Sequence, residues 1–137
     1  MPSDRYVICV AEDNPADVYL LRYALTAAGL HFDLKILEDG AEALRFVQDE
    51  NAVTPHLFIL DMNLPKRSGT EVLAAIRRHP ALSSVKVAVL TSSASPLDKT
   101  RSEELGASYY FQKPLDLDNF LRIGNDIKAL LQQASSR

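Results

Sequence analysis

The sequence has a single cysteine among its 137 residues, so no disulfide can form within the chain. No apolar run approaches the roughly 20 residues that a membrane-spanning helix needs. The formal net charge is only −3, which gives no overall attraction to nucleic acid or to an anionic membrane. Apart from the tail at residues 134–137, there is no linker, repeat or low-complexity stretch. We therefore expect neither a direct nucleic-acid partner nor a membrane partner.

The chain does contain enough apolar sequence for one well-formed core. Hydrophobic residues make up 47% of the sequence and charged residues 24%, as in ordinary globular proteins. A chain of this length is too short for two ordinary domains. The start of the sequence leads directly into a strand-like run and does not resemble a signal peptide. We expect one cytoplasmic domain over residues 1–137, with its core at about residues 5–133 and no output domain.

Strand-like and helix-like segments alternate from one end of the chain to the other. Short apolar runs predict five strands, at Tyr6–Ala11, Leu34–Leu37, Leu57–Leu60, Val85–Leu90 and Tyr109–Gln112. Helical periodicity with capping signals predicts five helices, at residues 14–29, 41–48, 70–79, 96–105 and 117–131. Five such units with short connections predict an α/β fold, a doubly wound parallel sheet with helices on both faces.

Polar residues follow four of the predicted strands at their carboxyl ends. Glu12 and Asp13 follow the first strand, Asp61 the third, Thr91 the fourth and Lys113 the fifth. In an open parallel sheet, ligands bind in the crevice outside these ends, so the five side chains are expected to converge. Three acids, a hydroxyl and an ammonium suit an aspartate that accepts a phosphoryl group with a magnesium ion.

Each part of that set has a defined chemical role. Clustered carboxylates repel one another unless a cation lies among them, and Mg²⁺ favours hard oxygen ligands; Mn²⁺ can substitute. The predicted ligands are Glu12, Asp13, Asp61 and the main-chain carbonyl of Asn63. Asp61 is the candidate nucleophile, because carboxylates form aspartyl-phosphate intermediates. Lys113 would neutralise the charge of the transferring group.

Taken singly, these features have plainer explanations, namely a solvated acidic loop at Glu12-Asp13 and a surface lysine at Lys113. Because all of these residues occur together, each at a strand end, a phosphoryl-binding site is favoured over the plainer explanations. Lys113 precedes Pro114, and an X–Pro bond can be cis at a cost of roughly 0.5–1 kcal/mol. A cis bond there would aim the lysine back across the strand ends.

With these residues in view, the sequence resembles the receiver domains of bacterial two-component response regulators. The matching segments are Glu12-Asp13-Asn14, Leu60-Asp61-Met62-Asn63-Leu64-Pro65, Gly69, Leu90-Thr91-Ser92 and Tyr110-Phe111-Gln112-Lys113-Pro114. The resemblance implies strand order 2-1-3-4-5, Asp61 as phosphoacceptor, and Glu12 and Asp13 as magnesium-binding acids. It also implies that Thr91 and Lys113 contact the phosphoryl group. Such a protein is not an ordinary enzyme, although it catalyses its own phosphorylation and dephosphorylation.

Three further segments are similar to single-domain regulators that partner phytochrome-type histidine kinases. They are Glu12-Asp13-Asn14-Pro15-Ala16-Asp17, Asn63-Leu64-Pro65-Lys66 and Thr91-Ser92-Ser93. In the wider family, the phosphoryl donor is a histidine on a kinase or a phosphotransfer protein, or a small acyl phosphate. The resemblance also implies a possible homodimer through the face made of the fourth helix, the fifth strand and the fifth helix.

The resemblance implies further roles for four positions, two in a conformational switch and two in hydrolysis of the acyl phosphate. Phosphorylation draws in the threonine, here Thr91, and turns an aromatic residue inward, here Tyr110, which alters that same face. The alternative for Tyr110 is a half-buried strand aromatic with no signalling role. Asn63 and Ser93 fall where the family tunes access of the hydrolytic water.

Three other functions fit parts of the pattern. A phosphohydrolase of the haloacid dehalogenase class uses a strand-end aspartate, but it needs a second acid where this chain has Asn63. A flavin-binding module needs a hydroxyl- or glycine-rich phosphate loop where this chain has Glu12-Asp13, whose charges would repel a phosphate. A scaffold with a vestigial site is the third, and loss of partner binding on Asp61→Asn substitution would argue against it.

Overall fold

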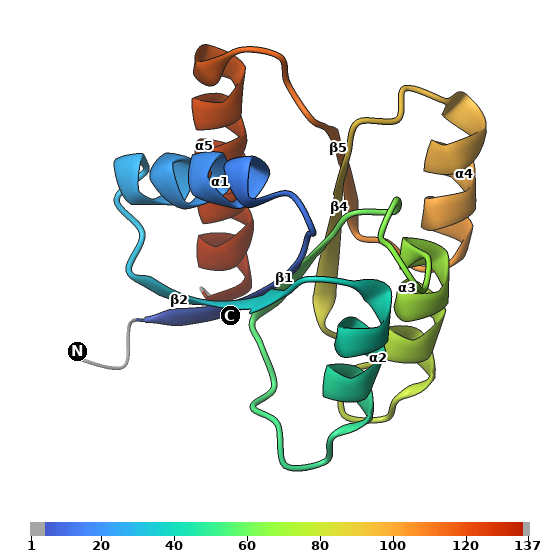
Figure 1. Ribbon diagram of the computed structural model, residues 1–137. Helices are drawn as coiled ribbons and strands as arrows, with labels where there is room; N and C mark the ends of the chain where they lie inside the picture. Colours follow the sequence, from blue (N-terminus) through green and yellow to red (C-terminus); the bar gives the residue numbers. More distant parts are fainter. Residues whose placement is uncertain (1–4, 136–137) are drawn as a thin grey trace.

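One parallel sheet organises the fold, as the ribbon in Figure 1 shows. The computed structural model describes residues 5–135 of the chain, with side chains over residues 5–133. The strands lie in the order β2-β1-β3-β4-β5. Their bounds are β1 Tyr6–Ala11, β2 Phe32–Leu37, β3 Leu57–Leu60, β4 Lys86–Thr91 and β5 Tyr109–Gln112. The helices are α1 Pro15–Ala27, α2 Gly40–Gln48, α3 Gly69–Arg78, α4 Pro96–Glu104 and α5 Leu117–Ser135.

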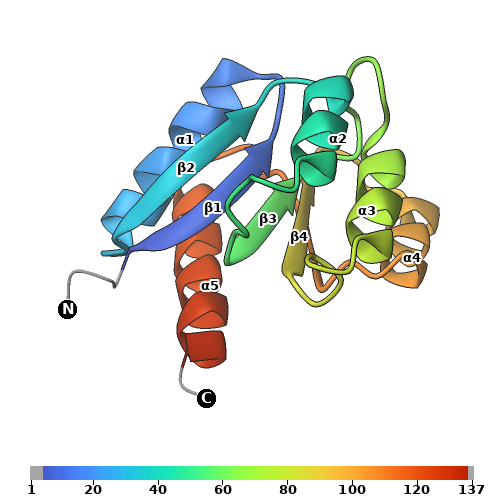
Figure 2. The same ribbon diagram turned by 90° about the horizontal axis from the view of Figure 1, so that it is seen from below.

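Helices cover both faces of the sheet, so the predicted doubly wound α/β fold and its strand order are confirmed. Helices α1 and α5 lie on one face, and α2, α3 and α4 lie on the other (Figures 1 and 2). The alternation of strand side chains divides the core accordingly: Ile8 and Val10 point toward α1 and α5, while Cys9 and Ala11 point toward α2 and α3. Cys9 is fully buried, as a small core hydrophobe.

Capping residues start the helices that follow the strands. Asn14 accepts a hydrogen bond from the Ala16 N–H, and Pro15 occupies the first position of α1. Ser68 and Glu71 form a reciprocal capping box at the start of α3, and the Ser95 side chain caps α4. The caps fix the start of each helix, and the site residues lie between the strand ends and these helix starts.

Three predicted details were wrong. Strand β2 begins at Phe32, two residues early, because Phe32 and Asp33 pair with β1. Strand β4 runs one residue later than expected: Val85 closes a turn through its N–H to the Leu82 carbonyl, and Thr91 is the last strand residue. Leu117 was expected on the apolar stripe of α5, yet it is 45% exposed at the first position of that helix.

Helix α4 buries little of its own surface. Of its residues only Ser102 is buried. Beyond its C-terminus, the Gly106 carbonyl accepts two hydrogen bonds from the Arg77 guanidinium, from Nε at 2.9 Å and from Nη2 at 2.7 Å. Arg77 Nη1 also donates to the Val85 carbonyl at 2.6 Å, so one side chain joins α3 to the loops before β4 and β5.

No helix within residues 5–135 has both the length and the apolar character needed to cross a membrane.

Candidate phosphoacceptor and metal site

The predicted site residues do converge at the carboxyl ends of the strands, and main-chain hydrogen bonds continue the sheet beyond those ends. The Asp61 N–H donates to the Ala11 carbonyl at 3.1 Å, and the Glu12 N–H donates to the Leu37 carbonyl at 3.0 Å. The Lys113 N–H donates to the Thr91 carbonyl at 2.7 Å. These bonds fix the backbone of each functional residue against a neighbouring strand.

Above the strand ends, three carboxylates form a cluster that could hold a metal ion. One oxygen each from Glu12, Asp13 and Asp61 lies within 4.8 Å of the others. Glu12 and Asp61 are buried, at 4% and 5% exposure, whereas Asp13 is exposed. Acids this close repel each other unless a cation is shared among them, and hard oxygen donors are the ligands that Mg²⁺ prefers. The residues present therefore fit a divalent cation.

Lys113 contacts two of the clustered acids and is not a surface lysine. Its side chain is only 12% exposed, and Nζ lies 2.8 Å from Glu12 Oε1 and 2.9 Å from Asp61 Oδ2. The described residues contain no cis peptide bond, so Lys113 reaches the acids without the cis Lys113–Pro114 bond that the sequence allowed.

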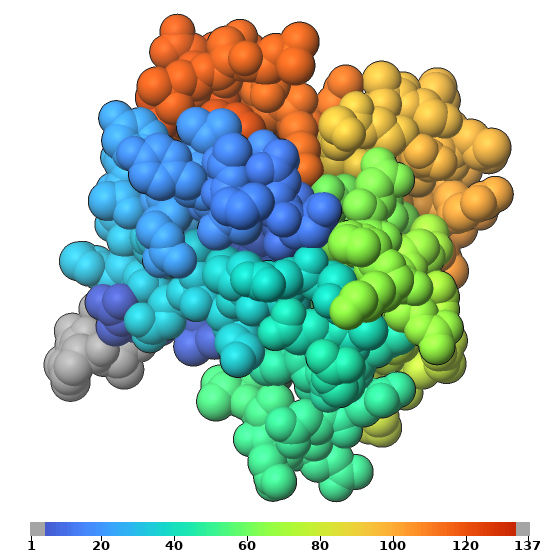
Figure 3. Space-filling view, viewed as in Figure 1, coloured from blue at the N-terminus to red at the C-terminus, as the bar shows by residue number. Residues whose placement is uncertain are grey.

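A fourth carboxylate, Asp17, was not among the predicted site residues. Its Oδ2 lies 2.8 Å from Lys113 Nζ, and its side chain is 18% exposed. Asp17 is in the first turn of α1, whose start lies over the strand ends. The available signal was its place four residues after Asp13, just inside a capped helix. Figure 3 shows this end of the molecule, with α1 in blue beside the segments that precede α2 and α3.

The charges at the site perturb two pKa values. Burial raises the pKa of Glu12 to about 7, and the Asp61 carboxylate adds to the rise, while the Lys113 ammonium opposes it. Burial alone would lower the pKa of Lys113, but hydrogen bonds to Asp17, Glu12 and Asp61 outweigh burial and raise it. Lys113 therefore stays charged at neutral pH.

A chain of hydrogen bonds leads from Asp61 to the outer face. The Asn63 N–H donates to Asp61 Oδ1 at 3.0 Å, and the Asn63 side-chain amide donates to Thr91 Oγ1 at 3.4 Å. The Ser93 N–H also donates to Thr91 Oγ1 at 3.4 Å, and the Tyr110 hydroxyl donates to the Ser93 carbonyl at 3.2 Å. Within residues 5–133, the Thr91 hydroxyl makes no direct hydrogen bond to Asp61; it connects through Asn63.

Behind Asp61 the backbone is tightly packed. A Cβ atom at Gly69 would lie 2.5 Å from the Asp61 carbonyl oxygen and 2.5 Å from Met62 Cα. The Gly69 N–H donates to the Met62 carbonyl at 3.0 Å. Only glycine allows this approach, which explains why the matching segments include Gly69.

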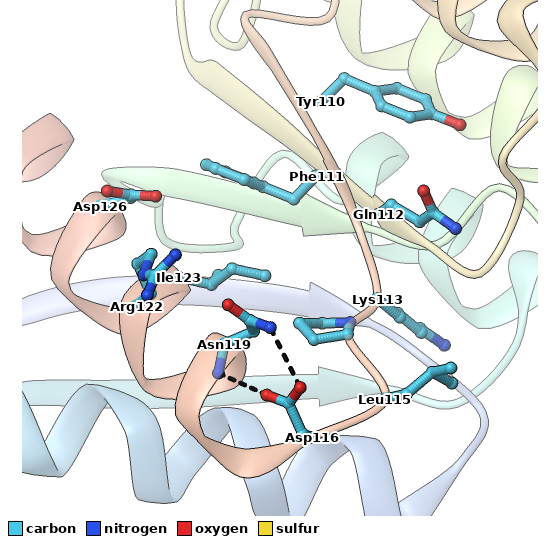
Figure 4. Close-up of a pocket in the computed structure, with 11 residues that line it drawn as sticks. Tyr110, Phe111, Gln112, Lys113, Leu115, Asp116, Asn119, Arg122, Ile123 and Asp126 are labelled. Atoms are coloured by element: carbon cyan, nitrogen blue, oxygen red, sulfur yellow. Dashed lines mark hydrogen bonds between the residues drawn. The ribbon is translucent and has the colours of Figure 1, made fainter.

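Two surface cavities lie along the face formed by α4, β5 and α5. One cavity of about 550 Å³ is lined by residues 110–116 and by the first turns of α5 (Figure 4). Another, of about 360 Å³, lies between Tyr110 and the start of α4. Tyr110 borders both, and Lys113 borders the larger one. The acidic cluster itself lies outside both cavities.

Comparison with known proteins identifies the family. Residues 8–123, well over half of the chain, match the response regulator receiver domain. The chain belongs to this family. As a receiver domain it is a signalling protein of two-component systems, in which response regulators act with histidine kinases. Its acidic pocket fits Mg²⁺ and phosphorylation of an aspartate.

The relatives of this receiver domain include a phytochrome response regulator. The response regulator Rcp1 of Synechocystis is 37% identical over 127 residues, which cover 90% of this chain and 86% of Rcp1. The crystal structure of Mn²⁺-bound Rcp1 has a TM-score of 0.83 and covers 90% of this chain and 92% of that one. The phosphorylated cyanobacterial phytochrome response regulator RcpA has a TM-score of 0.86, 33% identity, and coverage of 95% and 96%. The predicted resemblance to this group is confirmed.

Proposed function

We propose that Asp61 is the residue that accepts the phosphoryl group in this receiver domain. The observation that carries the proposal is the environment of its carboxylate. Asp61 Oδ1 accepts the Asn63 N–H, Oδ2 contacts the Lys113 ammonium, and two further acids complete a cation cluster. An aspartate whose carboxylate accepts two hydrogen bonds beside a cation site is positioned for nucleophilic attack on phosphorus.

The three acids of the cluster, Glu12, Asp13 and Asp61, would hold Mg²⁺ or Mn²⁺, and we propose the Asn63 main-chain carbonyl as a fourth ligand. When bound, the ion neutralises charge on the phosphoryl oxygens. The chain's own cation, Lys113, would contact one phosphoryl oxygen from the β5 side, and the Thr91 hydroxyl would donate to another. The 12% exposure of the Lys113 side chain limits screening of its charge by water.

The transfer can be written with each bond accounted for. An Asp61 carboxylate oxygen forms a bond to phosphorus as the donor's phosphorus–nitrogen bond breaks, and the released histidine imidazole keeps the electron pair. In hydrolysis, which is a separate step, a water oxygen attacks phosphorus, the acyl phosphate bond breaks, and inorganic phosphate and the Asp61 carboxylate are released. We propose that this chain's residues promote both steps, and that Asn63 and Ser93 tune the second by limiting access of that water.

Signalling is proposed to begin at Thr91 and reach the outer face through Ser93 and Tyr110. The Ser93 N–H contacts the Thr91 hydroxyl, and its carbonyl accepts from Tyr110, so movement of Thr91 toward a phosphoryl group would disturb the Tyr110 contact. Tyr110 borders both cavities, so its inward rotation would reshape the α4-β5-α5 face. The shift needs only a few kcal/mol of preference for one conformer.

The proposed donor is a histidine kinase or a histidine phosphotransfer protein, and the likeness to the phytochrome response regulator RcpA supports a kinase of the phytochrome type. The output is proposed to be protein–protein contact, with homodimerisation through the α4-β5-α5 face as one form. We also propose that the chain makes no direct contact with nucleic acid. The single receiver unit with its core at residues 5–133, and the cytoplasmic location, stay predictions.

Incubation with acetyl phosphate and Mg²⁺, followed by intact-mass measurement, tests this function. We expect a gain of one phosphoryl group that a chelator prevents and that mild base removes, because acyl phosphates are base-labile. Steady release of phosphate with no adduct at any time would favour a hydrolase. No adduct from acetyl phosphate, and none from any histidine-phosphorylated donor, would contradict the phosphoacceptor function.

The affinity for the cation is expected to depend on pH. Because the pKa of Glu12 is raised to about 7, this ligand is protonated below that value and charged above it. Metal binding needs the charged form, so Mn²⁺ affinity should fall by up to about tenfold per pH unit below about pH 7. Titration of Mn²⁺ followed by electron paramagnetic resonance would measure it. An affinity unchanged between about pH 8 and pH 6 would argue against Glu12 as a ligand.

A further inference from the structure

Lys113 holds three carboxylates at once, and one of them takes no part in the cation cluster. Its Nζ lies 2.8 Å from Glu12, 2.8 Å from Asp17 and 2.9 Å from Asp61, so each N–H of the ammonium has one acceptor. Glu12 and Asp61 also belong to the acidic cluster, whereas Asp17 does not. Asp17 comes from α1, and Glu12 and Asp61 come from the ends of β1 and β3.

This arrangement creates a competition between two cations. The Lys113 ammonium and a divalent ion both need the charges of Glu12 and Asp61, and each would repel the other at close range. Without another acceptor, the ammonium would be attracted only to the two carboxylates that the metal also needs. Asp17 supplies an acceptor outside the cluster, with only 18% of its side chain exposed, and therefore little screened by water.

We propose that Asp17 is a positioning residue that draws the Lys113 ammonium toward α1. In this way the divalent cation and the lysine can be accommodated together in one acidic site. Asp17 acts through Lys113 and contacts neither the cation nor the phosphoryl group. The inference rests on the proposed function, because it takes Glu12, Asp13 and Asp61 as the cation ligands.

Mn²⁺ affinity of the full chain, measured by electron paramagnetic resonance of the free ion, tests the proposal. Asp17→Asn keeps the shape of the side chain and removes its charge; we expect affinity to fall by about tenfold, as for directly coupled groups. Glu38→Gln is the matched control, because Glu38 lines the same surface cavity as Glu12 and Asp13 and forms no ion pair with Lys113. That control should change affinity by less than about twofold.

Two more variants separate positioning from a simple loss of negative charge. In a Lys113→Met background the competing ammonium is absent, so Asp17→Asn should then weaken Mn²⁺ binding no more than Glu38→Gln does. Asp17→Glu retains the charge and should restore most of the affinity. A tenfold loss that persists in the Lys113→Met background would overturn the positioning role, as would equal affinities of Asp17→Asn and the unaltered protein.

Failure of the proposal is distinguishable from failure of the proposed function. If the unaltered chain binds no Mn²⁺ at all, the cation site is wrong and the inference falls with it. If the unaltered chain binds Mn²⁺ and only the Asp17 effects are missing, the site stands and the inference alone is overturned.

Discussion

Asp61→Asn should abolish the gain of a phosphoryl group from acetyl phosphate, with no adduct detectable by intact mass. The substitution preserves the shape of the side chain but replaces a carboxylate oxygen, the nucleophile, with an amide nitrogen. The Asn63 N–H can still donate to the remaining oxygen, so the loop beyond β3 should keep its place. The effect is expected to be all-or-none, because a displacement on phosphorus cannot proceed without its nucleophile.

The matched control for this prediction is Asp126→Asn, an exposed aspartate on α5 that lies outside the acidic cluster. It should take up the phosphoryl group like the unaltered chain. Borohydride reduction of the phosphorylated chain, followed by peptide mapping, should find homoserine in place of Asp61. An adduct on the Asp61→Asn variant would mean that another side chain is the acceptor, with Asp13 as the first to examine because it is exposed within the cluster.

The sequence was sufficient to predict the position of Asp61 but not the charge balance around it. Residues 57–60 are all apolar and all buried, so the strand and the aspartate that ends it follow from local sequence. Main-chain bonds between parallel strands then place Glu12 and Lys113 beside Asp61. This part of the site depends on topology, which alternating strands and helices specify well.

The side-chain partners of Asp17 and Asp98 could not be predicted from the sequence. Each lies in the first turn of a helix, where acids are common because they interact favourably with the helix dipole. Whether such an acid also contacts Lys113, as Asp17 does, or the Ser93 hydroxyl at 2.6 Å, as Asp98 does, depends on the rotation of the helix about its axis. That rotation is set by packing against the sheet and against other helices, which periodicity alone does not determine.

The second large effect concerns stability, at the opposite end of the sheet. Arg77→Met should lower the free energy of unfolding by about 2–4 kcal/mol in urea titrations followed by circular dichroism. Its guanidinium donates to the carbonyls of Gly106 and Val85, and to that of Ser83 at 3.1 Å. Hydrogen bonds from a charged donor contribute about 1.5–3 kcal/mol each when buried, and methionine leaves these carbonyls without that donor. Partial exposure of the site allows water to replace some of them.

Arg78→Met is the matched control, because Arg78 is the next residue along α3 and is exposed. Its substitution should change the free energy of unfolding by no more than about 0.5 kcal/mol. A loss of unfolding free energy for Arg77→Met equal to that of Arg78→Met would show that the carbonyls find other donors at no cost.

Below the unfolding transition, Arg77→Met should still take up a phosphoryl group. Arg77 binds the loops before β4 and β5, whereas Asp61 and Lys113 follow the carboxyl ends of their strands. Loss of phosphoryl uptake in the folded Arg77→Met variant would instead indicate that the Arg77 contact with the Gly106 carbonyl, just beyond α4, affects the site through β4 and β5.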